Sequence, residues 1–92
     1  MELSQLEIYI AAAEEKSFTA AAERLYISHS TISRTVAALE EELGVQLIRR
    51  SNRVLELTPA GQELLARAGE LLTACDDAAE QVRLAAERSR EI

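Results

Sequence analysis

The sequence predicts a mostly helical fold of three short helices, one two-stranded β hairpin and a long C-terminal helix. Ninety-two residues are enough for one small domain and too few for a catalytic α/β fold or a barrel. Two tyrosines, one phenylalanine, three glycines and one proline are too few for a turn-rich β sandwich. Apolar residues instead recur at spacings of three and four, which is the period of amphipathic helices.

The first two helices follow from this spacing and from one capping residue. An apolar face that starts at Leu3 and runs through Leu6 and Ile10 to Ala13 predicts a helix that ends near residue 15 or 16. Ser17 is expected to cap a second short helix. The apolar face of that helix consists of Phe18, Ala21, Ala22 and Leu25, and residues 25–27 form the expected turn.

The third helix has the clearest signals at both of its ends. Ser28 is a candidate N-cap, and Gly44 occupies the usual C-terminal position. Between them, apolar residues at spacings of four, three and four define the buried face: Ile32, Val36, Leu39 and Leu43.

A β hairpin and a long helix are predicted for the rest of the chain. The short runs 47–49 and 54–57 flank a polar, basic tip at residues 50–53, and Thr58 followed by Pro59 is a typical helix start. The following helix carries a heptad pattern, which predicts pairing with another helix. Its expected dimer interface consists of Leu64, Leu65, Ala68, Leu71, Leu72, Cys75, Ala78, Val82 and Ala85.

Three helices and a hairpin in this order predict a winged helix-turn-helix at residues 1–57, followed by a linker or dimerisation helix at residues 58–92. In that arrangement the third helix enters the DNA major groove and the hairpin, or wing, lies along the DNA backbone. The net charge of −6 argues at first against such a partner. The acidic residues, however, are absent from residues 25–39 and 44–55, where the candidate DNA contacts lie. These are Ser28, His29, Ser30, Thr31, Ser33 and Arg34 in the third helix, and Arg49, Arg50 and Arg53 in the wing.

Each candidate also has a simpler interpretation. His29 can be a solvated residue of the first helical turn, and the hydroxyls of residues 30, 31 and 33 can be ordinary caps. Arg34 can form a surface ion pair, and a basic hairpin tip can protect an edge strand. Residues 40–42, which are all glutamates, are interpreted as a solvated face, and Cys75 as a small apolar residue of the heptad seam rather than a redox sensor.

Four stretches of the sequence resemble the DNA-binding region of LysR-type transcriptional regulators. They are residues 17–25 (SFTAAAERL), the dipeptides at 27–28 (IS) and 33–34 (SR), residues 39–45 (LEEELGV) and residues 57–61 (LTPAG). The resemblance covers residues 3 to about 72 and implies a larger ligand-sensing domain after the linker helix, so these 92 residues are expected to be a fragment or a truncated relative. It also implies antiparallel pairing of two linker helices. The preferred register for that pairing places Cys75 against Ala78, Leu71 against Val82 and Ala68 against Ala85. The sequence departs from the family pattern at His29, where glutamine is usual, at Ser30, and at residues 48 and 49.

The expected function is therefore sequence-specific binding of a double-stranded DNA operator by a homodimeric or larger transcriptional regulator. No catalytic group, cofactor or metal site is expected, because a lone histidine, a lone cysteine and no glycine-rich phosphate loop cannot assemble one. A small-molecule effector would act only through a domain outside these residues. One cysteine and no signal segment predict a cytoplasmic protein, not a membrane protein. The alternative is a protein-interaction adaptor that uses the winged fold as a scaffold and its acidic helices as the binding surface.

Overall fold

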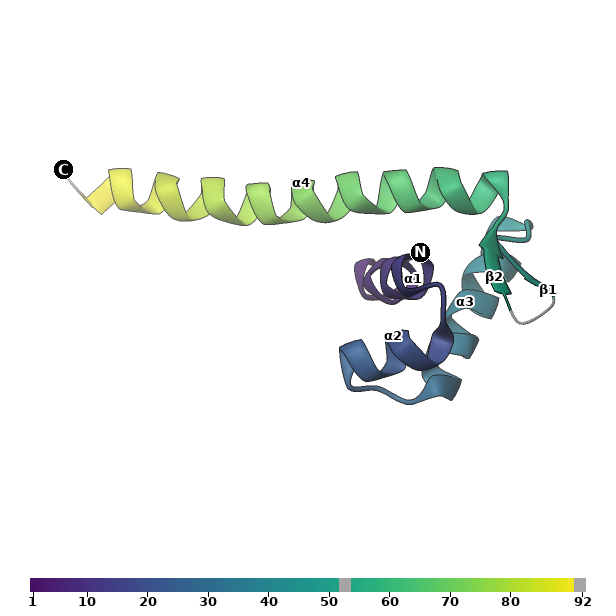
Figure 1. The fold of residues 1–92 in the computed structure, drawn as a ribbon. Coiled ribbons are helices and arrows are strands. Elements are labelled where there is room, and N and C mark those ends of the chain that lie inside the picture. The colour runs from purple at the N-terminus through teal and green to yellow at the C-terminus, as the bar shows by residue number, and fades with distance from the viewer. Residues whose placement is uncertain (52–53, 91–92) are drawn as a thin grey trace.

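The computed structural model describes residues 1–51 and 54–90, and it contains every predicted element in the predicted order. Three helices are followed by a two-stranded hairpin and by a long helix that crosses over the first one (Figure 1). The elements are α1 (Leu3–Glu15), α2 (Phe18–Leu25), α3 (His29–Leu43), β1 (Ile48–Ser51), β2 (Val54–Leu57) and α4 (Pro59–Arg90).

The predicted capping residues define the ends of α2 and α3. The Ser17 hydroxyl accepts a hydrogen bond from the Ala20 N–H at 3.1 Å, and the Ser28 hydroxyl accepts one from the Thr31 N–H at 3.2 Å. Each bond satisfies an N–H group that the helix itself leaves unpaired. Gly44 ends α3 in the left-handed conformation, with φ 69°. The three-helix part of the prediction is thus confirmed down to its caps.

The hairpin is longer than the sequence predicts. Strands β1 and β2 pair antiparallel from Ile48 opposite Leu57 to Ser51 opposite Val54, so that only residues 52 and 53 lie between them. The prediction of a tip at residues 50–53 is therefore wrong in its extent, because backbone pairing continues beyond the apolar side chains that mark the strands in the sequence. Leu47 precedes β1 and is buried beneath it.

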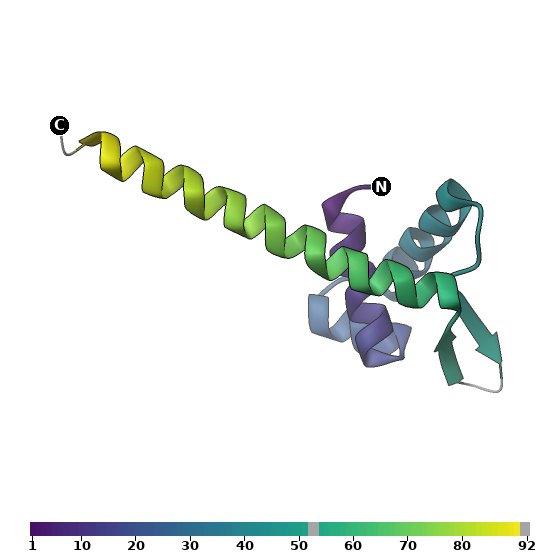
Figure 2. The ribbon, with the colours of Figure 1, turned by 90° about the horizontal axis from the view of Figure 1, so that it is seen from above.

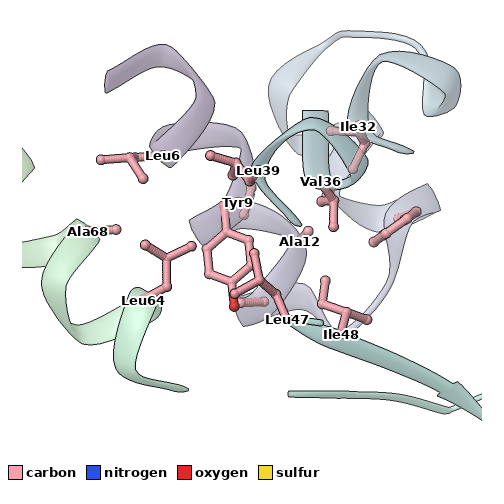
Figure 3. Packing of buried hydrophobic residues seen from close by; sticks show 14 of the residues in the cluster. Leu6, Tyr9, Ala12, Ile32, Val36, Leu39, Leu47, Ile48, Leu64 and Ala68 are labelled. Atoms are coloured by element: carbon pink, nitrogen blue, oxygen red, sulfur yellow. The ribbon is translucent and has the colours of Figure 1, made fainter. Parts of the chain in front are cut away.

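The core lies where α1 is enclosed by α2, α3 and the start of α4 (Figure 3). Two residues predicted on buried faces are wrong: Leu3 and Leu43 are 42% and 40% exposed, because each lies at the edge of the molecule near the end of its helix. Tyr9, which the apolar spacing passes over, is fully buried. The largest buried side chains of the core are Tyr9, Leu6, Ile32, Leu39 and Leu47.

Helix α4 belongs to the domain only at its beginning. Its buried residues are Gly61, Leu64 and Ala68, and residues 73–90 are all exposed. The helix extends well past the other elements (Figure 2), and the molecule measures 63 × 26 × 18 Å. Within residues 1–51 and 54–90, no helix is both long and apolar enough to cross a membrane.

Candidate nucleic-acid interface

The first turn of α3 presents a cluster of hydroxyl groups around its N-cap. The Ser28 Oγ lies 2.8 Å from Thr31 Oγ1 and 3.1 Å from Ser30 Oγ, in addition to accepting the Thr31 N–H. Ser28 and Ser30 are exposed, whereas Thr31 is half-buried. The structure therefore brings these three predicted residues together, with Thr31 mainly engaged in the cap and Ser30 facing solvent.

His29 stands beside this cluster and is held by an aromatic contact. Its ring centroid lies 5.8 Å from that of Phe18, and the two ring planes are inclined at 59°. Phe18 is buried at the start of α2, whereas His29 is exposed. A tilted pair of this kind orients the exposed ring against a fixed one. The imidazole is thus oriented on the protein surface by the packing of α2 against α3.

The remaining candidates in α3 differ in their access to solvent. Ser33 is half-buried, and Arg34, one residue further, is exposed. Arg34 forms no ion pair with any of the residues that the structure describes. The surface ion pair that the sequence left open for Arg34 is thus absent from the described part of the chain.

The wing presents one described basic side chain. Arg49 is exposed and lies opposite Glu56 in the hairpin register, yet no ion pair joins them within the described residues. The backbone of Arg50 pairs with that of Leu55. Arg53 lies outside the described residues.

Three arginines elsewhere on the molecule are paired with carboxylates, whereas Arg88 and Arg90 in the last turn of α4 form no ion pair with any described residue. Arg24 contacts Glu14 at 2.9 Å and Glu15 at 3.2 Å. On α4, ion pairs of 2.7, 3.4 and 3.2 Å join Arg67 to Glu63, Arg67 to Glu70 and Arg83 to Glu80. Pairing leaves these guanidinium groups locally neutralised, in contrast to Arg34 and Arg49.

A glutamate of α3 anchors the start of the wing. The Glu40 Oε2 accepts hydrogen bonds from the backbone N–H groups of Leu47 at 2.8 Å and Ile48 at 3.3 Å. The interpretation of residues 40–42 as a solvated face is therefore wrong for Glu40, because its carboxylate satisfies two backbone donors at the entry to β1. Glu42 is exposed and pairs with the N-terminal amine at 2.7 Å.

The same segment is joined to α4 and α1 by further hydrogen bonds. The Thr58 hydroxyl donates to the Gln46 carbonyl at 2.6 Å and accepts from the Gly61 N–H at 3.0 Å. The Tyr9 hydroxyl donates to the Gly61 carbonyl at 2.7 Å. Burial, followed by the charge of Glu40, raises the pKa of Tyr9 to about 12. The spacing of apolar residues does not indicate Tyr9, and the LTPAG stretch is the sequence signal that includes Gly61.

The expected dimer seam on α4 divides into two parts. Leu64 and Ala68 are 8% and 0% exposed because they pack into the core of their own domain (Figure 3). Their assignment to a dimer interface is therefore wrong, and Leu65 also packs against the core. Leu71, at 43% exposure, is the first exposed large hydrophobic residue of the helix. The seam residues still open to a partner are Leu71, Leu72, Cys75, Ala78, Val82 and Ala85, of which only Leu72 is half-buried.

Beside this surface, the described residues form a groove but no cluster of metal-ligating side chains. Within the described ranges, no group of three or more His, Cys, Asp or Glu side chains is placed to hold a metal ion. A shallow groove runs between the end of α1, β2 and the start of α4, and its lining includes Lys16, Val54 and Gln62.

Comparison with known proteins places the chain in a family. Residues 3–62 match the model of the lysR family of bacterial regulatory helix-turn-helix proteins. The HTH-type transcriptional regulator ClcR of Pseudomonas putida is 50% identical over 72 residues, which are 78% of this chain and 24% of ClcR. The chain spans about a quarter of the length of most of the curated relatives it matches.

Solved structures agree with this match over nearly the whole chain. The CbnR_DBD-DNA complex has 43% sequence identity and a TM-score of 0.90, with 94% of this chain and 99% of that chain covered. Full-length CbnR complexed with its target DNA has 42% identity and a TM-score of 0.86, with 90% of this chain and 29% of that chain covered. The chain belongs to the LysR family of bacterial regulatory helix-turn-helix proteins.

Proposed function

We propose that the chain binds double-stranded DNA with sequence preference, as the DNA-binding portion of a dimeric LysR-type transcriptional regulator of the cytoplasm, and that it performs no catalysis. The single observation that carries this proposal is the exposed surface of α3 and the wing, where Arg34 and Arg49 lack the carboxylate partners of Arg24, Arg67 and Arg83. Exposed guanidinium groups without carboxylate partners suit the phosphates of DNA. The similar CbnR domain has been solved in complex with DNA, which supports DNA binding by this chain.

The first turn of α3 is the part proposed to read bases. Ser30 and His29 are exposed there, and their short polar side chains can hydrogen-bond base edges in the major groove. Thr31 and Ser33 are half-buried and contribute less. The contact of His29 with Phe18 fixes where its ring enters the groove. His29 therefore replaces the glutamine of the family pattern and is expected to alter the preferred sequence.

The wing is proposed to contact the phosphate backbone through Arg49, Arg50 and Arg53. Such contacts position a protein on DNA without reading its sequence. Glu40 fixes the wing relative to α3 through its two hydrogen bonds to the start of β1. A fixed wing keeps the distance between the groove contact and the backbone contact constant.

The exposed part of α4 is proposed to pair with a second copy in antiparallel orientation. A single helix without tertiary contacts is marginal in water, and α4 has none to bury its apolar face from residue 73 onward. Because Leu64 and Ala68 are already buried, the pairing centres on layers of Leu71 with Val82 and of Cys75 with Ala78. We propose that residues 1–57 act as the DNA-binding unit and residues 58–92 as the linker helix. The first turns of α4 nevertheless pack on the DNA-binding unit.

Fluorescence anisotropy with labelled duplex DNA tests the proposal. About three phosphates neutralised per protomer give a dimer a slope of roughly −5 in a plot of log affinity against log salt concentration. Arg34→Ala and Arg49→Ala should each weaken binding and flatten the slope, whereas Arg67→Ala, which removes a paired arginine on α4, should change neither. A wild-type slope close to zero, or no binding at low salt, would refute DNA binding and favour the adaptor function.

Selection of bound sequences from a random DNA pool tests the specific part of the proposal. The wild-type chain should enrich a defined sequence, and His29→Gln should enrich a different one. Recovery of unrelated sequences by both proteins would leave only nonspecific binding and would refute a base-reading role for His29.

A further inference from the structure

An exposed tyrosine lies in the turn that leads into α3. Tyr26 is 95% exposed, more than any other large hydrophobic residue in the described part of the chain. Its hydroxyl forms no hydrogen bond with any described residue. The ring therefore contributes no packing to the folded domain.

The backbone at Tyr26 does not favour a tyrosine either. Tyr26 ends α2 in the left-handed region with φ 57°, and its N–H donates to the carbonyls of Ala22 and Glu23. Glycine and asparagine adopt this conformation most readily, whereas a bulky side chain is disfavoured. Neither packing nor backbone conformation thus accounts for a tyrosine at this position.

The position of the turn relates Tyr26 to the candidate interface. The turn between α2 and α3 lies on the side of the domain opposite α4 (Figure 1). Tyr26 precedes the N-cap Ser28 by two residues and the exposed His29 by three. The Schellman-type bonds of the turn hold its backbone in one conformation, so the side chain projects from a fixed point beside the first turn of α3.

We propose that Tyr26 contacts DNA, with its hydroxyl donating a hydrogen bond to a phosphate oxygen at the edge of the major groove. This inference rests on the proposed function, because it requires the first turn of α3 to enter the groove. A tyrosine reaches further than the serines beside it and has only two side-chain torsions to order on binding. The phenol is neutral, so the contact adds affinity without displacing a counterion.

Three variants test the contact by fluorescence anisotropy, first with a labelled duplex of random sequence at low salt and then with the selected preferred site. Tyr26→Phe removes only the hydroxyl, and the loss of one hydrogen bond to a charged group weakens binding about tenfold. Because the dimer makes this contact twice, its affinity for both DNAs should fall about a hundredfold. Its salt slope should equal that of the wild type, whereas Arg49→Ala flattens the slope. Tyr26→Ala should weaken binding at least as much.

Tyr26→Asn separates this role from folding. Asparagine suits a positive φ, so this variant should be as stable to urea as the wild type or more so, and the dimer should still bind DNA about a hundredfold more weakly. Equal affinities for wild type, Tyr26→Phe and Tyr26→Asn would overturn the contact and leave the proposed function intact, and would point to a protein partner for the exposed ring. Failure of the wild-type chain to bind DNA would overturn both.

Discussion

Gly61 and Gly69 lie in the same helix, and their substitution by alanine is expected to have opposite effects. A Cβ atom at Gly61 would overlap the Leu47 carbonyl oxygen and lie 2.9 Å from the Tyr9 hydroxyl oxygen. The Leu47 carbonyl cannot easily retreat, because it accepts the Thr58 N–H at 3.0 Å. At Gly69 a Cβ meets nothing within 4 Å.

The magnitudes follow from these contacts. Forcing a methyl group into a packed site costs about 1 to 3 kcal/mol, and displacing the Tyr9–Gly61 hydrogen bond adds about 1 to 2 kcal/mol. Gly61→Ala should therefore lower the free energy of unfolding by roughly 3 to 4 kcal/mol, or Tm by about 15 to 25 °C in a domain of this size. Gly69→Ala should raise stability by about 0.5 to 1 kcal/mol, because alanine is favoured over glycine within a helix.

Urea denaturation followed by circular dichroism measures both variants. The two proteins and the wild type must be compared at one protein concentration, because dimerisation makes stability depend on concentration. Equal midpoints for Gly61→Ala and Gly69→Ala would refute the close approach of α4 to Leu47. A stabilised Gly61→Ala variant would refute it more strongly.

Four further outcomes are expected. The pKa of Tyr9 is raised from 10.0 to about 12 in the folded state. The stability that this provides is therefore complete below pH 10 and falls by about 3 kcal/mol as the pH rises to 12. Urea midpoints across this range should fall less in Tyr9→Phe than in the wild type. Glu40→Ala leaves two backbone N–H groups without their acceptor and should lower the free energy of unfolding by about 2 kcal/mol. Unchanged hydrogen exchange of the amides of residues 47 and 48 would contradict the loss of these two hydrogen bonds. Leu71→Glu should dissociate the dimer in sedimentation experiments and weaken DNA binding, whereas a dimer of unchanged stability would place the interface elsewhere. In the wild type, mild oxidation should yield little disulfide at Cys75, because antiparallel pairing offsets the two copies by three residues, about 4.5 Å along the axis.

The helices and their ends were predictable because their signals are local. Ser17, Ser28 and Gly44 each act within four residues of their own position, and the structure confirms all three. The exposure of Leu3 and Leu43 was not predictable from spacing, because a helix end can extend past the elements that cover its middle. The burial of Tyr9 depends on Gly61, 52 residues further along the chain, and no periodicity reports such a contact.

The sequence predicts which residues of the candidate interface are basic or apolar, and the structure shows which of them are paired or buried. Arg24 and Arg34 both lie in the helix-turn-helix and are both exposed, yet among the described residues only Arg24 forms ion pairs with carboxylates. The heptad pattern of α4 likewise does not distinguish a partner in the same chain from one in a second copy. Ala68 and Cys75 lie seven residues apart in one seam and so occupy the same heptad position, but only Ala68 is buried in its own domain.

Leu47 is the point at which α3, the wing and α4 are connected. Its N–H donates to Glu40 of α3, its carbonyl accepts the N–H of Thr58 at the start of α4, and it precedes β1 directly. The glycine at position 61 lets α4 approach this carbonyl, and Tyr9 ties that same turn of α4 to α1. The direction of α4 is thereby fixed relative to α3. In the proposed dimer, α4 sets the separation of the two α3 helices, and that separation must match the spacing of the DNA half-sites. Substitutions at Glu40 or Gly61 that leave the chain folded should therefore change the preferred half-site spacing in selection experiments without changing the bases read within each half-site.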